Sequence, residues 1–125
     1  GHHIAELGFI FILIGAAGEL IEISLLIGIA NNAASQGIVE ALHAVSGAIG
    51  PTAVSCGFLG FATIGLAILV QKNFHKLIAL GIIVVGVIGT ILPVANYESD
   101  LMIIPYMGLS LLLVTLGILV IRAKD

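Results

Sequence analysis

Four long runs of apolar residues divide the chain, and short polar segments separate them. The first run covers about residues 4–30, and its core from Leu7 to Ile29 would be roughly 34 Å long as a helix, enough to cross a bilayer. The third and fourth runs cover about residues 77–95 and 101–121. Apolar stretches of this length predict transmembrane helices, because the bilayer interior offers no water to an unpaired backbone.

The second apolar stretch, residues 38–70, is too long for one simple span. As a single helix it would measure roughly 50 Å, whereas the hydrocarbon core of a bilayer is about 30 Å thick. Gly50-Pro51 offers a natural break, since proline suits the first turn of a helix. We therefore predict a short amphipathic helix over about residues 38–49, at the membrane surface or against the bundle, and a second span over about 51–70. One continuous, tilted and kinked helix is the alternative.

Composition indicates that lipid is the solvent for most of the chain. Hydrophobic residues make up 60% of it and charged residues only 9%, whereas soluble domains carry about 25% charged residues. We expect residues 1–125 to form a single membrane domain, an all-α integral membrane protein with a four-transmembrane-helix bundle. The chain has no basic patch of the kind that binds nucleic acid, which excludes that partner.

The basic residues predict the orientation of the bundle. The positive-inside rule makes the side that carries them cytoplasmic, so we expect both termini inside, in a plasma or inner membrane. Tyr97 and Tyr106 would flank the outer interface, as aromatic belts do. All four basic residues fall on one side of a four-span arrangement: Lys72, Lys76, Arg122 and Lys124.

Glu19 and Glu22 are the main candidates for a functional site. They share one face of the first predicted helix with Gly15, and residue 18 is the centre of the Leu7–Ile29 core, which places Glu19 near the bilayer midplane. An acidic residue at that depth costs about 2.5–3.5 kcal/mol and often marks function. Four arrangements would satisfy the pair: a shared proton, a bound cation or metal, a positive group on another subunit or ligand, or a neutral hydrogen-bonded acid that only joins helices.

Glu40 and His43 form a Glu-x-x-His pair on the predicted surface helix. Side chains three residues apart converge, and carboxylate-bridged di-metal bundles use this spacing. Such a site needs a second Glu-x-x-His pair, which the chain lacks, although Glu19 and Glu22 could supply carboxylates. The metal hypothesis is therefore weak and no cofactor is identified; a solvated polar edge on an amphipathic helix is the simpler interpretation.

Small residues recur at three- or four-residue spacing inside the predicted spans. Such positions let helices approach closely when no hydrophobic effect drives them together, within the chain or against a partner subunit. The candidate packing positions are Gly15, Cys56, Gly57, Gly60, Gly86 and Gly89.

The run from Gly15 to Ile21 resembles the glutamate segment of the small multidrug resistance exporters. The resemblance as a whole covers about a dozen residues. That family surrounds its substrate cations with Trp and Tyr, and this chain has no Trp and no Tyr in its first three predicted spans. The long segment from Asn31 to Gly50 also departs from the family's outline. We therefore carry no functional residues over from it.

Two functional hypotheses follow from the sequence. The chain has no nucleophile elbow, phosphate-binding glycine loop or Cys-x-x-Cys motif, so we do not expect an enzyme by itself. The first hypothesis is a non-catalytic membrane subunit of a larger complex, such as a respiratory, photosynthetic or metal-dependent oxidoreductase assembly, packed against other subunits in the lipid bilayer. The alternative is a small homo-oligomeric transporter or channel in which Glu19 and Glu22 bind a proton or cation.

Overall fold

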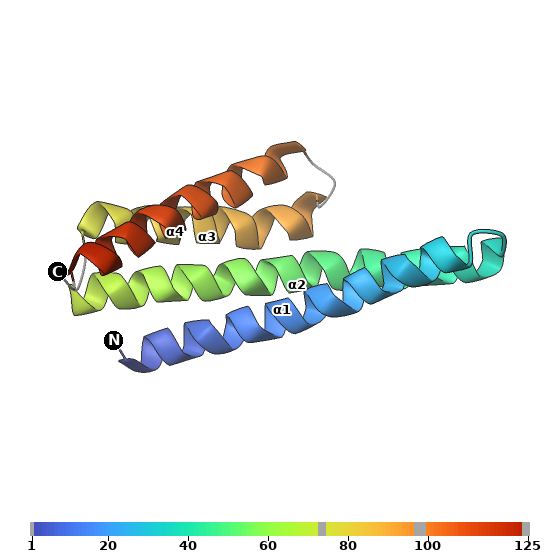
Figure 1. The fold of residues 1–125 in the computed structure, drawn as a ribbon, viewed down its shortest axis with the longest axis horizontal. Helices are drawn as coiled ribbons and strands as arrows, with labels where there is room; N and C mark the ends of the chain where they lie inside the picture. Colours follow the sequence, from blue (N-terminus) through green and yellow to red (C-terminus); the bar gives the residue numbers. More distant parts are fainter. Residues whose placement is uncertain (1, 73–74, 97–99, 124–125) are drawn as a thin grey trace.

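The computed structural model describes residues 2–72, 75–96 and 100–123, and these residues are helical throughout apart from the connections (Figure 1). The helices are α1 (His2–Asn31), α2 (Gln36–Gln71), α3 (Lys76–Asn96) and α4 (Ile103–Ala123), with a short 3-10 turn η1 (Asp100–Met102) before α4. All four are long and apolar enough to span a membrane. The sequence predicted these four helices and the all-α class.

The surface is covered with large apolar side chains, as expected for a chain whose solvent is lipid. Leu20, Leu77 and Val94, for example, are 67%, 69% and 73% exposed. A soluble protein of this size would bury such residues, because each would lower its stability in water. The structure therefore supports the membrane assignment independently of the length of the helices.

The helices lie in a row rather than in a closed bundle. Among the described residues, α1 makes backbone contacts with α2 alone, and α4 makes them with α3 and η1. The helix α2 is thus central, with α1 on one side and α3 on the other (Figure 1). A small core forms where α4 leans over α3 toward α2, and its buried members are Val54, Phe58, Met102 and Leu109.

The predicted short helix over residues 38–49 is wrong as a separate element. Those residues are the first part of α2, which runs without a break through Gly50 and Pro51. Proline inside a helix costs about 3 kcal/mol because it removes one backbone hydrogen bond and crowds the preceding turn. Packing against α1 opposes that cost: Gly50 is buried, Ser46 is 5% exposed, and a Cβ atom on Gly28 would lie 3.1 Å from Leu42 Cδ1. The prediction of a break rested on the length of residues 38–70 and on Gly50-Pro51, without the packing against α1; the alternative of one continuous helix is the one observed.

Glycines bring the backbones of α1 and α2 into direct contact. A Cβ atom on Gly8 would lie 2.8 Å from the carbonyl oxygen of Gly60, and a Cβ on Gly60 would lie 2.6 Å from the carbonyl oxygen of Gly8. Two turns further along α1, a Cβ atom on Gly15 would lie 2.8 Å from both the carbonyl oxygen of Ala53 and the amide nitrogen of Gly57. No larger residue fits at these positions without separating the helices, so they fix how far α1 is shifted along α2.

This register leaves one end of the α1–α2 hairpin beyond α3 and α4. The α2–α3 contact aligns Ser55 with Thr90, because the Ser55 hydroxyl donates a 2.7 Å hydrogen bond to the Thr90 carbonyl. The last residue of α3, Asn96, is therefore level with about Gly50, since the two helices run in opposite directions. The part of α2 before Gly50 extends about 20 Å further, as the cyan end of the hairpin shows in Figure 1. We call residues 23–49 the projecting hairpin.

The close α1–α2 contact predicts a strong effect of Gly15→Ala. The new methyl group would meet backbone atoms of Ala53 and Gly57, which cannot rotate away. We expect a loss of about 1–3 kcal/mol in stability, the usual cost of overpacking, measured by unfolding the purified chain in mixed micelles with increasing SDS. In the control Gly117→Ala the methyl group has nothing within 4 Å, and stability should stay the same or rise by up to about 1 kcal/mol. Equal effects of the two substitutions would contradict this packing.

The continuity of α2 predicts a long distance between spin labels at Ala41 and Leu66, both exposed positions on this helix. An unbroken helix separates these Cα atoms by about 37 Å, whereas a right-angle bend at Gly50 would bring them to about 28 Å. Pulsed electron paramagnetic resonance in a Cys56→Ser background measures the difference. A distance distribution centred near the shorter value would restore the separate surface helix.

Candidate functional site

Glu19 and Glu22 lie together on α1 and face α2. Both are half-buried, and their side chains lie three residues apart on one face of the helix. The carboxyl group of Glu22 rests on the backbone of α2, since a Cβ atom on Gly50 would lie 2.6 Å from its Oε1 atom. The missing side chain of Gly50 thus provides the space that the Glu22 carboxyl occupies.

The Oε1 atom of Glu19 is buried and has no hydrogen-bond partner among the described residues. A buried oxygen without a partner is costly, because it gives up water and receives nothing in return. Lys72, Lys76 and Arg122 lie at the other end of the helices, at the end of α2, the start of α3 and the end of α4. No described basic side chain of this chain can therefore reach Glu19, and Lys124 lies outside the described residues.

The contact with α2 fixes the level of this pair relative to α3, whereas its predicted depth near the bilayer midplane stays a prediction. The midplane position followed from α1 alone, whereas the contact of Glu22 with Gly50 makes it level with the last turn of α3. A hydrocarbon core of about 30 Å placed over α3 and α4 would have Glu19 and Glu22 close to its boundary. A core centred on α1 instead would leave only about the first one or two turns of α3 outside lipid.

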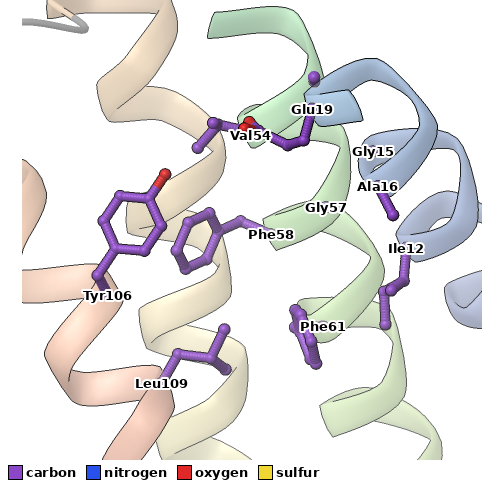
Figure 2. Close-up of a pocket in the computed structure, with 11 residues that line it drawn as sticks. Ile12, Gly15, Ala16, Glu19, Val54, Gly57, Phe58, Phe61, Tyr106 and Leu109 are labelled. Atoms are coloured by element: carbon purple, nitrogen blue, oxygen red, sulfur yellow. The ribbon is translucent and has the colours of Figure 1, made fainter. Parts of the chain in front are cut away.

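A groove of about 350 Å³ opens beside Glu19, between α1, α2 and α4 (Figure 2). Glu19 lies at one end, the Tyr106 hydroxyl points toward that same end, and Phe61 and Leu109 lie toward the other (Figure 2). The rings of Phe58 and Tyr106 meet edge to face, with centroids 5.3 Å apart, and so connect α2 with α4. The remaining lining residues are small or apolar: Ile12, Gly15, Ala16, Ala53, Val54 and Gly57.

This arrangement suits a guest with an apolar body and one group that is positively charged or donates hydrogen bonds. An apolar surface with a few placed polar groups is typical of a binding site, and the polar groups determine the orientation of the guest. Sequence reasoning assigned Tyr106 to an interfacial belt and did not single out Phe58 or Phe61. No pattern in the sequence indicates that these rings meet, because the path of α4 over α2 decides it. Tyr97 lies outside the described residues.

Glu40 and His43 lie apart from this site, on the projecting hairpin. Both side chains are exposed, and Gln36 Nε2 donates a 3.0 Å hydrogen bond to Glu40 Oε1. Glu40 is ten residues before Gly50 along α2, about 15 Å from the level of Glu22. The described residues contain no group of three or more His, Cys, Asp or Glu side chains placed to hold a metal ion. The fold therefore does not combine the four side chains in one metal site.

The candidate packing residues divide between the two interfaces of α2. Gly15 on α1 is buried against α2, Gly60 on α2 is buried against α1, and the Cys56 thiol donates a 3.5 Å hydrogen bond to the Phe11 carbonyl. Gly57 contacts Gly15 through its backbone, but a Cβ atom on Gly57 itself would meet nothing within 4 Å, so this position borders the groove. On the other side of α2, a Cβ on Gly86 would lie 2.7 Å from Ala62, and Gly89 accommodates the ring of Phe58.

No protein-family model, curated protein or solved structure matches the chain.

Proposed function

We propose that this chain is a small non-catalytic subunit of a larger membrane protein complex, of the kind formed by oxidoreductase assemblies. The observation that carries the proposal is the projecting hairpin. If α3 and α4 cross the bilayer, the hairpin extends about 20 Å past the hydrocarbon core on the outer side. The position of the basic residues supports this orientation, with both termini on the cytoplasmic side.

The projecting hairpin is too apolar to stand alone in water. Leu26, Ile27, Ile38 and Val45 are 48%, 57%, 46% and 46% exposed. Exposed apolar side chains in one region outside lipid typically mark a surface that another protein covers. A neighbouring subunit would remove this surface from water, in addition to any contact that it makes within the bilayer.

Tilting does not remove the need for a partner. The helix α2 has 36 residues and is about 54 Å long. To fit inside a core of about 30 Å it would have to tilt by roughly 56°, beyond the 0–40° range of transmembrane helices. α3 and α4, with 21 residues each, fit the same core almost upright. The mismatch between the two pairs of helices therefore favours projection.

The proposal predicts the composition of the native particle. Gentle extraction from the chain's own membrane, followed by native mass measurement and identification of the polypeptides, should give foreign subunits in fixed ratio. Ile27→Gln should lower the recovery of that particle by about tenfold, equivalent to roughly 1.4 kcal/mol, because it removes an exposed apolar contact. Asp100→Asn, an exposed change at the start of η1, should leave recovery unchanged. A particle that holds only copies of this chain would refute the subunit proposal.

The second candidate is a homo-oligomeric proton- or cation-coupled transporter. The adjacent carboxyl groups of Glu19 and Glu22, with Glu19 at the end of an open groove, favour it, because two neighbouring carboxyl groups can share a proton and exchange it for a cation. It predicts proton- or cation-dependent flux by the purified chain in liposomes, abolished by Glu19→Gln and retained in Asp100→Asn. Normal flux with both Glu19→Gln and Glu22→Gln would show that these carboxyl groups are not the transport site.

A further inference from the structure

By helical spacing, the α2 residues that line the groove beside Glu19 lie on the same side of α2 as one face of the projecting hairpin. The α2 residues that face α1 include Leu42, Gly50, Ala53 and Gly60, as their contacts with α1 show. The α2 residues that follow these by about one position in the sequence lie beside the contact with α1. They form a single stripe along α2, because positions three or four apart share a helix face. The stripe contains the groove residues Val54, Phe58 and Phe61 and, nearer the hairpin tip, Gly47 and His43.

Two glycines on or beside this stripe leave room for close approach of another backbone, whereas Val54 and Phe58 are buried where they line the groove. A Cβ atom on Gly57 or on Gly47 would meet nothing within 4 Å, and Ala16 on the facing side of the groove is exposed. Glycine and alanine at such positions let a neighbouring transmembrane helix pack tightly. A volume of about 350 Å³ holds a few side chains from such a helix.

The charge of the site indicates what those side chains must include. Glu19 has a buried Oε1 atom without a partner among the described residues, and Glu22 and Glu40 add acidic groups on the same half of the molecule. The whole chain has only four Lys or Arg, and the described ones, Lys72, Lys76 and Arg122, lie at the opposite ends of the helices. A positive side chain from outside would therefore complement this half of the molecule.

A second copy of this chain does not supply that charge. A copy in the same orientation has its Lys and Arg at the same cytoplasmic end, about a bilayer thickness from Glu19. His43 of such a copy is seven residues before Gly50 on α2, about 10 Å from the level of the carboxyl pair. A lipid does not account for the whole stripe either, since acyl chains end where the projecting hairpin begins.

We propose that a transmembrane helix of a different polypeptide occupies the groove and places a Lys or Arg side chain against Glu19. The helix continues past the bilayer boundary along Gly47 and His43, and so also covers part of the projecting hairpin. Only a helix satisfies its own backbone within lipid and still extends beyond it. This inference rests on the proposed subunit function and adds the place, the secondary structure and the charge of the partner.

Photochemical cross-linking from the groove tests the occupant. Benzoylphenylalanine in place of Ala16, in chain expressed in its own cells, should cross-link a foreign peptide from an apolar segment that contains Lys or Arg. The control places the same group at Val94, which is 73% exposed on α3, and should give several-fold less of that product. Cross-links from Ala16 to this same chain, to lipid alone, or to a foreign segment without a basic residue would each overturn the proposal.

A charge exchange tests the pairing itself. Glu19→Lys should reduce recovery of the complex several-fold, and changing the cross-linked basic residue of the partner to Glu should restore it. Asp100→Asn should leave recovery unchanged. Failure of the exchange to restore the complex overturns the ion pair, even if foreign subunits are present. Absence of any foreign subunit in the native particle would instead refute the subunit function, so the two failures are distinguishable.

Discussion

The close contact between α1 and α2 determines most of what this molecule presents to its surroundings. The carbonyl oxygen of Gly60 lies against Gly8, and the carbonyl oxygen of Gly8 lies against Gly60. The carbonyl oxygen of Ala53 lies against Gly15 in the same way. In a bilayer, where apolar burial gives little advantage to one helix contact over another, such steric fit selects the register. A shift by one turn would put a Cβ atom into each of these contacts. The register in turn fixes the level of Glu22 against Gly50.

The same contact explains how α2 tolerates Pro51. Residues before the proline would gain little from helix formation alone, since the proline interrupts the hydrogen bonding of the turn. Here α1 continues beside them as far as Asn31, and Leu42 and Ser46 pack against it. The Thr52 hydroxyl donates a 3.1 Å hydrogen bond to the Ala48 carbonyl in the same turn. Tertiary packing thus extends the helix through a residue that would end an isolated one.

The parts of the structure that depend on one segment at a time could be predicted from sequence. The length of each apolar run gave the four spans, and the polar residues near Asn32 and Lys72 gave the connections. The element over residues 38–49 could not be predicted this way, because its neighbour α1 decides whether it continues into α2. The groove could not be predicted from sequence either, because Tyr106 contacts Phe58 only through the path of α4 over α2.

The depth of the glutamate pair in the bilayer decides what its side chains would require of a partner. At the midplane a carboxylate costs about 2.5–3.5 kcal/mol, which favours a permanently neutral pair or a transport role. Near the boundary that cost falls, because side chains reach the headgroup region and its water. The remaining demand comes from the buried Oε1 atom of Glu19, which faces a groove and not water. In the proposed complex, a hydrogen-bond donor that enters the groove would satisfy this atom, and a partner helix packed on the projecting hairpin would hold that donor at a fixed height. The apolar hairpin and the acidic groove are then two parts of one surface, the first supplying area and the second supplying orientation.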